Sequence, residues 1–100
     1  MPHFLYILHS KTANRFYIGE SVDANIRTQQ HNDHLFPGSA TAIATDWSIQ
    51  LVVACDDRTH ARALERWTKS QKSIAVIKRL IQEDQYREYQ LQRFRNQRMT

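Results

Sequence analysis

The stretch LYILHSKTANRFYIGES, Leu5 to Ser21, contains two apolar runs separated by a polar turn. The first run covers residues 3–9 and the second covers residues 15–19, and each has the length of a short strand. Between them, Thr12-Ala13-Asn14 supplies turn chemistry, because asparagine accepts the left-handed backbone conformation. The sequence therefore predicts a β-hairpin whose second strand ends at Gly19. Each of the two strands carries one tyrosine.

A helix is predicted directly after the hairpin. Ser21 or Asp23 can cap its N-terminus, and the helix would then run to about Asn32. On a helix in this position, we expect Val22 and Ile26 to face the core.

A loop and a third strand follow. Residues 33–46 contain Pro37-Gly38 and several small side chains, which favour a loop. From Trp47 to Cys55 apolar residues alternate with other residues, which is the period of a half-buried strand. The side chains expected on one face of this strand are Ile49, Leu51, Val53 and Cys55.

Two capped helices and a tail complete the predicted elements. Thr59 is expected to cap a helix that ends near Ser70, and Ser73 is expected to cap the next helix. Residues 83–100 are polar and rich in glutamine, and we expect a helix that docks only loosely, because its apolar residues form no single stripe. The core-facing residues expected in the two capped helices are Ala61, Leu64, Thr68, Ile74, Ile77, Leu80 and Ile81.

The length and composition limit the class of protein. A chain of 100 residues fits one domain, which we place at residues 1–82, with residues 83–100 as a basic helical tail. No apolar run is long enough to span a bilayer, so no membrane partner is expected. The N-terminus has neither the basic leader nor the cleavage site of a signal peptide. Cys55 is the only cysteine, which excludes an internal disulfide and favours a cytoplasmic setting.

The net charge of +4 is distributed unevenly along the chain. No lysine or arginine lies between Arg27 and Arg58. Positive charge is found in the first third, in residues 58–79, and in residues 89–100, which contain no acid. An uneven charge of this kind favours a face that binds nucleic acid. The three arginines of the tail are Arg93, Arg95 and Arg98.

Five polar residues on this predicted scaffold have the chemistry of a phosphodiesterase. Tyr6 and Tyr17 lie on adjacent strands, Arg27 and His31 are four apart on one helix, and Glu65 lies on a later helix. A carboxylate can hold a hard divalent cation, and the cation polarises the phosphate. A guanidinium neutralises the phosphate oxygens, and a phenol or imidazole can position or deprotonate water.

The order and spacing of these motifs resemble the GIY-YIG nuclease superfamily, in particular its small stand-alone members, which are related to the N-terminal domain of the excision-repair incision subunit. The two tyrosine motifs read Phe4-Leu5-Tyr6 and Tyr17-Ile18-Gly19. The resemblance spans about residues 3–81. Its later segments are DANIRTQQHN, DWSIQLVV, ARALERWTK and KSIAVIKRLI.

The resemblance implies an α+β fold, in which a three-stranded antiparallel β-sheet is flanked by helices. It also implies a DNA endonuclease, acting in repair or recombination, that leaves 5′-phosphate and 3′-hydroxyl ends. Tyr6 would orient or activate water, Tyr17 would contact metal-bound water or a phosphate, and these two roles could be exchanged. Arg27 would stabilise the phosphate, His31 would assist, and Glu65 would hold one Mg²⁺ or Mn²⁺. RNA as a substrate, a homodimer and a larger repair assembly are left open.

The sequence departs from the family pattern in three places. One is that no asparagine occurs between Glu65 and Phe94, whereas some repair-type relatives use an asparagine after the metal-binding glutamate. Phe4-Leu5 replace the glycine and isoleucine that give the family its name. Residues 33–46 contain no lysine or arginine, whereas relatives commonly place basic residues after the histidine. The uncharged loop leaves a second hypothesis open, which is a nucleic-acid-binding module of the same fold that cuts poorly or not at all.

Each site residue also has an ordinary structural reading. Tyr6 and Tyr17 could be half-buried strand aromatics, a position that tyrosine favours. Glu65 could pair with Arg62, Arg66 or Lys69 on the surface of its helix. The catalytic interpretation therefore depends on the five residues occurring together and not on any one of them.

Overall fold

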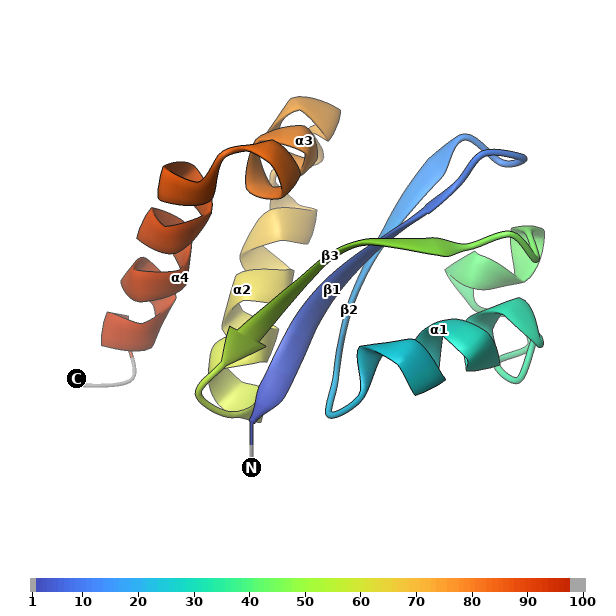
Figure 1. Cartoon of the computed structure of the whole chain (residues 1–100), viewed down its shortest axis with the longest axis horizontal. Coiled ribbons are helices and arrows are strands. Elements are labelled where there is room, and N and C mark those ends of the chain that lie inside the picture. The colour runs from blue at the N-terminus through green and yellow to red at the C-terminus, as the bar shows by residue number, and fades with distance from the viewer. Residues whose placement is uncertain (1, 98–100) are drawn as a thin grey trace.

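The computed structural model describes residues 2–97 and contains one three-stranded antiparallel sheet (Figure 1). Strand β1 (His3–Ser10) lies between β2 (Arg15–Ser21) and β3 (Ser48–Cys55). The turn between β1 and β2 contains Asn14 at φ 51°, the left-handed conformation expected for asparagine there. The predicted hairpin, third strand and α+β class are confirmed, although β2 continues two residues beyond the predicted end.

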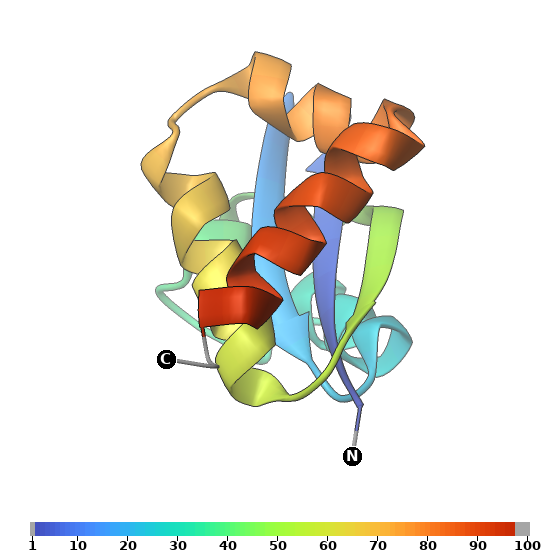
Figure 2. The same ribbon diagram turned by 90° about the vertical axis from the view of Figure 1, so that its left-hand side faces the viewer.

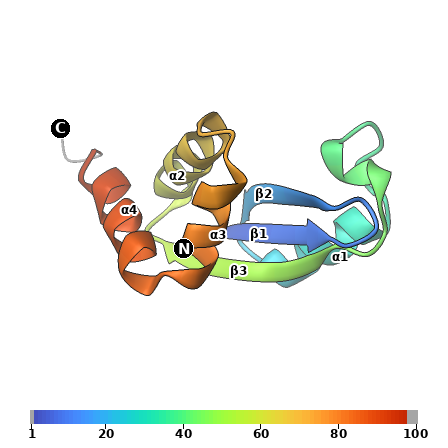
Figure 3. The same cartoon turned by 90° about the horizontal axis from the view of Figure 1, so that it is seen from above.

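Helices cover both faces of the sheet. Helix α1 and a short 3₁₀ turn pack on one face, whereas α2, α3 and α4 pack on the other. Seen from above, the strands run between the end of the molecule that carries α4 and the end that carries α1 (Figure 3). Among residues 2–97, none of the helices combines the length and apolar character required to cross a bilayer. The helices are α1 (Ala24–Asn32), the 3₁₀ turn (Ala40–Ile43), α2 (Arg58–Ser70), α3 (Ile74–Gln82) and α4 (Asp84–Gln97).

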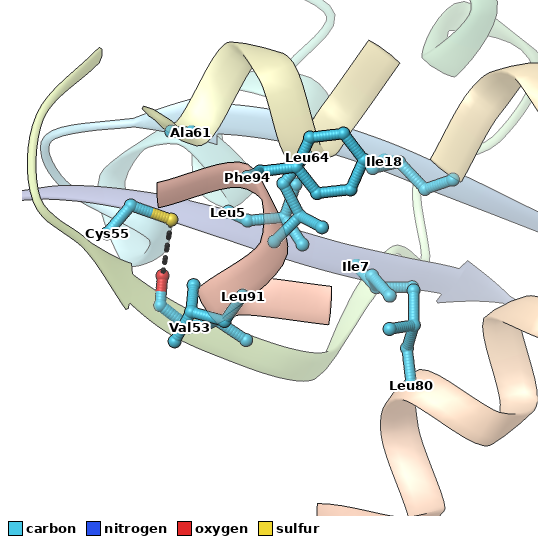
Figure 4. Packing of buried hydrophobic residues seen from close by; sticks show 10 residues of the cluster. All are labelled: Leu5, Ile7, Ile18, Val53, Cys55, Ala61, Leu64, Leu80, Leu91 and Phe94. Atoms are coloured by element: carbon cyan, nitrogen blue, oxygen red, sulfur yellow. Dashed lines mark hydrogen bonds between the residues drawn. The ribbon is translucent and has the colours of Figure 1, made fainter. Parts of the chain in front are cut away.

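The central strand β1 divides its side chains between two buried clusters. Leu5 and Ile7 point to the side of α2, α3 and α4, whereas Tyr6 and Leu8 point to the side of α1, as the two-residue period of a strand requires. We call the first cluster the helical core, and its buried members are Leu5, Ile7, Ile18, Val53, Cys55, Ala61, Leu64, Leu80, Leu91 and Phe94 (Figure 4). We call the second the α1-side cluster, and its buried members are Tyr6, Leu8, Ala24, Ala44 and Trp47.

A β-bulge in β3 changes which side chains of that strand share a face. Ile7 lies opposite Leu51, but Leu8 lies opposite Ile49, so Gln50 is an extra residue in β3. The extra residue reverses the alternation, and Ile49 consequently packs against the α1-side cluster. The prediction that Ile49 shares a face with the other three apolar residues of β3 is therefore wrong.

Helix α1 presents a different face to the sheet from the one predicted. Asp23 caps it by accepting a hydrogen bond from Ile26 N at 3.0 Å. The side chains of Val22 and Ile26 are 54% and 58% exposed, so the prediction that they face the core is wrong. Large aromatic rings from the sheet fill the space beneath α1, which leaves room only for small or polar residues of the helix. The buried residues of α1 are Ala24, Thr28 and His31.

The first residues of α2 also differ from the prediction. Asp57, and not Thr59, caps α2 by accepting a hydrogen bond from His60 N at 2.9 Å. The cap of α3 is Ser73, as predicted, because its hydroxyl accepts a hydrogen bond from Val76 N. Ala61, Leu64 and Thr68 are buried, as expected for the inner face of α2.

Helix α4 is firmly docked, so the expectation of a loosely docked tail is wrong. Leu91 and Phe94 are buried in the helical core, and Figure 2 shows α4 lying across the helical side of the molecule. The buried imidazole of His60 donates from Nε2 to Leu91 O at 2.8 Å, and Arg87 Nη1 donates to Leu80 O at 2.7 Å. Leu91 and Phe94 are three positions apart, and together with the partly buried Tyr86 they anchor the helix although they give only a weak signal in a polar sequence. Arg98 lies outside the described residues.

Candidate active site

The two phenols lie side by side on the α1 side of the hairpin. Tyr6 on β1 faces Gly19 across the ladder, and Tyr17 on β2 faces Leu8. The ring centroids of Tyr6 and Tyr17 are 6.3 Å apart. Tyr6 is 1% exposed, whereas Tyr17 is half-buried at the edge of the cluster. The hairpin therefore holds one buried phenol and one more accessible phenol next to each other.

Gly19 makes the position of Tyr6 possible. A Cβ atom built on Gly19 would lie 2.5 Å from Tyr6 Oη, 2.6 Å from its Cζ and 3.0 Å from Tyr17 Cε2. Such distances are too short for any side chain, so the Tyr6 ring occupies the volume that a Cβ would take. The sequence identified this glycine as the end of a strand and as part of the second tyrosine motif, whereas its spatial role depends on the residue across the ladder.

His31 connects the buried phenol to the 3₁₀ turn. Tyr6 Oη lies 3.1 Å from His31 Nε2, and His31 Nδ1 lies 2.7 Å from Thr41 Oγ1. When the Nδ1 hydrogen is donated to Thr41, Nε2 is free to accept the hydrogen bond of the Tyr6 hydroxyl. The hydroxyl of Ser39 lies 2.9 Å from Thr41 Oγ1 and extends the chain. The order of this chain is Tyr6, His31, Thr41 and Ser39.

The electrostatics of the cluster suit a proton transfer from phenol to imidazole. Burial and the charge of Arg27 lower the pKa of His31, so the imidazole is neutral at neutral pH. Burial and the neighbouring Tyr17 raise the pKa of Tyr6. Burial also raises the pKa of Tyr17, although the ammonium of Lys69 opposes this effect. Both phenols are therefore protonated at rest, and His31 is a neutral acceptor.

Arg27 lies against an aromatic ring and has no acidic partner within residues 2–97. Its Cζ lies 5.1 Å from the ring centroid of Phe36, and the ring of His31 lies 5.0 Å from the same centroid. Among the described residues no carboxylate forms an ion pair with Arg27, so the guanidinium is available to an anion. The charge of Arg27 opposes the rise that burial causes in the pKa of Tyr6 and of Tyr17.

Glu65 lies on α2, the helix that follows β3. Its negative charge raises the pKa of Tyr6 and of Tyr17, so its carboxylate is close enough to act on both. Lys69 Nζ donates to Glu65 Oε2 at 2.7 Å and lies 5.7 Å from the ring centroid of Tyr17. The structure thus brings all five predicted site residues into one region, where α1 and α2 meet the edge of the hairpin.

The donor set fits a weakly held divalent cation. Among residues 2–97, no three or more His, Cys, Asp or Glu side chains gather where they could hold a metal ion. Glu65 offers a single carboxylate in a shallow hollow of about 220 Å³. Mg²⁺ commonly binds one or two carboxylates and keeps several waters, so one carboxylate on an open hollow is compatible with it. The nearby Glu20 is already bonded to His3 and lies 3.7 Å from Arg58.

Several neighbours of the site were not found from the sequence. Thr41 and Phe36 belong to the loop, which has no periodic signal, so nothing indicated that they would contact His31. Lys69 is four residues after Glu65, and this spacing indicated a pair but not a contact with Tyr17. Glu20 acts on both phenols from the end of β2.

Comparison with protein-family models gives one match, to the GIY-YIG catalytic domain, over residues 2–78. The matched segment includes all five site residues and extends from β1 into α3. A search of curated proteins and a search of solved structures gave no match. The family match covers more than half of the chain.

Proposed function

Because the chain belongs to the GIY-YIG family, whose members are endonucleases, we propose that it hydrolyses phosphodiester bonds of DNA with one divalent cation. The observation that supports this proposal best is the contact of 3.1 Å between Tyr6 Oη and His31 Nε2. A buried phenol beside a neutral imidazole forms a pair that can take a proton from water. Arg27 and Glu65, at the same site, supply the charges that a phosphate and a cation require.

Tyr6 and His31 would share the proton transfer. As water attacks phosphorus, Tyr6 Oη takes one proton from it, and the phenol proton passes to His31 Nε2. His31 becomes an imidazolium, whose Nδ1 hydrogen remains bonded to Thr41. The P–O3′ bond breaks, and the leaving O3′ takes a proton from solvent, which gives 5′-phosphate and 3′-hydroxyl ends. We choose Tyr6 for this role because it is the phenol that has a proton acceptor within hydrogen-bond distance.

The remaining residues would act on the phosphate. The guanidinium of Arg27 would neutralise the non-bridging oxygens as negative charge develops in the transition state. The more accessible phenol of Tyr17 would donate to a phosphate oxygen or to metal-bound water. Mg²⁺ or Mn²⁺ bound to Glu65 would supply Lewis-acid stabilisation of the phosphate and of the leaving oxygen.

A second function has one specific observation in its favour. The Glu65 carboxylate is bonded to Lys69 at 2.7 Å, so it has a structural partner that does not require a metal. A binding module of the same fold would keep this pair, together with the phosphate-binding cations, without cutting.

Substitution of Glu65 by glutamine separates the two functions. The purified wild-type chain is expected to nick a supercoiled plasmid in millimolar Mg²⁺ or Mn²⁺ and to lose this activity with a chelator. Glu65→Gln is expected to lower the nicking rate about a thousandfold or more, because several kcal/mol of charge stabilisation depend on the cation. Its melting temperature is expected to match the wild type.

Glu88→Gln is the matched control, since Glu88 is an exposed glutamate on another helix. This variant is expected to cut as fast as the wild type. Full activity of Glu65→Gln would exclude the proposed cation site, and a wild-type chain that cuts with neither metal would leave the binding module as the function.

A further inference from the structure

Helix α2 carries a row of four exposed cations on one face. Their spacing of four, four and three residues places them along a single stripe of the helix. The only acid of α2, Glu65, lies within this row. We call the row the α2 basic stripe, and its members are Arg58, Arg62, Arg66 and Lys69.

Two of the four stripe cations have no acidic partner among the described residues, whereas Lys69 pairs with Glu65 at 2.7 Å. Arg62 and Arg66 form no ion pair with any described residue, and Arg58 approaches Glu20 only to 3.7 Å. In contrast, three arginines of the helices that follow form ion pairs of 3.0 Å or less. These pairs are Arg79 with Glu83, Arg87 with Asp84, and Arg95 with Asp56.

The stripe is continuous with the candidate active site. One shallow hollow is lined by Arg62, Glu65, Arg66 and Lys69, so three cations surround the proposed metal ligand. A second hollow, of about 300 Å³, has both Arg27 and Arg58 in its lining. Four helical residues advance about 6 Å along the axis, which is close to the step between successive phosphates of one nucleic-acid strand.

We propose that the α2 basic stripe is the track that binds the phosphate backbone of the strand being cut. Arg62 and Arg66 contact phosphates next to the scissile one, which lies at Glu65. The linear row and its passage through the site favour a polymer of regularly spaced phosphates over a single anion. The identity of this polymer as DNA rests on the proposed function, whereas the position of the track rests on the stripe itself.

Two arginines of α4 are held by other side chains of the protein. Arg93 stacks on Trp67, with its Cζ 5.0 Å from the ring centroid, and Arg95 is bonded to Asp56 at 2.9 Å. Arginines held in this way are less available to phosphates than the exposed Arg62 and Arg66.

The test measures binding in the absence of cleavage. Fluorescence anisotropy with a short labelled DNA duplex in EDTA gives log K as a function of log salt for the wild type and for Arg62→Gln/Arg66→Gln. Each lost phosphate contact reduces the salt slope by about 0.9, so the double variant is expected to lose about 1.8. Binding at physiological salt is expected to weaken about tenfold or more.

The control is Lys11→Gln/Lys78→Gln, which removes the same charge from exposed residues of the hairpin turn and of α3. It is expected to keep the wild-type slope and melting temperature. The track would be overturned if the stripe variant kept the wild-type salt slope or if the control variant lost as much slope as the stripe variant. It would also be overturned if the wild type did not bind the duplex. The nicking assay tests the nuclease function separately. If the wild-type chain never cuts DNA but Arg62→Gln/Arg66→Gln still lowers the salt slope, the track is supported and the proposed nuclease function is not.

Discussion

The two faces of the sheet are both buried, but they are built from different chemistry. The helical core consists of aliphatic and aromatic side chains and one cysteine, with Leu5 and Ile7 of β1 at its centre (Figure 4), and the buried His60 on this side bonds to backbone groups. The α1-side cluster instead contains the phenol of Tyr6 and the indole of Trp47, with the buried imidazole of His31 beside them, and the polar atoms of all three are hydrogen bonded to side chains or backbone. Trp47 Nε1, for example, donates to Thr41 O at 2.9 Å.

This difference shows that burial has two uses in one small domain. On the helical side it removes apolar surface from water, which stabilises the fold in proportion to the area buried. On the α1 side it strengthens and aligns hydrogen bonds and shifts the pKa of Tyr6 and His31. Substitutions on the first face should therefore change stability, and substitutions on the second should change chemistry.

The largest expected effect on stability comes from Phe94→Ala. Phe94 is 6% exposed in the helical core, and its ring centroid lies 5.8 Å from that of Trp67. Removing a buried phenylalanine side chain typically lowers the free energy of unfolding by about 3–5 kcal/mol. Chemical denaturation measures this loss, and nicking per folded molecule is expected to stay unchanged.

Tyr89→Ala is the control on the same helix, because Tyr89 is exposed. It should change the free energy of unfolding by less than about 0.5 kcal/mol. An equal, small effect of both substitutions would mean that α4 is not part of the core in solution.

Tyr6→Phe is expected to lower activity and to leave stability nearly unchanged, which is the reverse of Phe94→Ala. The substitution keeps the ring and removes the hydroxyl that lies 3.1 Å from His31 Nε2. Loss of a general base typically lowers the rate about a hundredfold or more, whereas the fold should persist. The measurements are the nicking rate and thermal melting of Tyr6→Phe and Tyr17→Phe. If Tyr17→Phe loses more activity than Tyr6→Phe, the two phenols have exchanged roles.

The pH profile of the wild type provides a further readout for this pair. His31 must be neutral to accept the phenol proton, and burial lowers its pKa below the ordinary histidine value. Activity should therefore be retained as the pH falls through that ordinary value, and it should be lost only at the lower pKa.

The smallest effect is expected at Ile26, which lies on the exposed face of α1. Ile26→Ser should change the free energy of unfolding by less than about 0.5 kcal/mol, because little apolar surface is lost from the interior. Ile18→Ser is the buried counterpart and should be strongly destabilising. Thermal melting of both variants compares the two positions, and strong destabilisation by Ile26→Ser would show that this face is covered in solution.

The elements that could be predicted from the sequence have local causes. The hairpin depends on two apolar runs and a turn around Asn14, and α3 depends on its cap Ser73. The bulge at Gln50 and the docking of α4 could not be predicted, because each depends on how distant segments pack. The inner face of α1 was missed for the same reason, since rings from the sheet determine which of its residues fit.

The candidate site shows a similar division. The five residues were found because their order and spacing resemble a family, and the structure places them together. Their supporting contacts were not found, because Gly19, Thr41 and Phe36 act through space on side chains from other elements. Sequence order can indicate which groups carry the chemistry, whereas the contacts that hold these groups in place join elements that are distant in the sequence.

The position of β1 between two strands has a consequence for motion in the site. Its backbone is hydrogen bonded to β2 on one side and β3 on the other, and its residues from Leu5 to Leu8 are buried. Opening such a strand requires both ladders to break, so its amide hydrogens should exchange with solvent only when the whole domain unfolds. Tyr6 therefore belongs to the slowest-exchanging part of the chain, whereas Tyr17 lies on an edge strand and Lys69 on an exposed helix face. The site thus joins a rigid phenol to partners that can adjust their positions around a substrate.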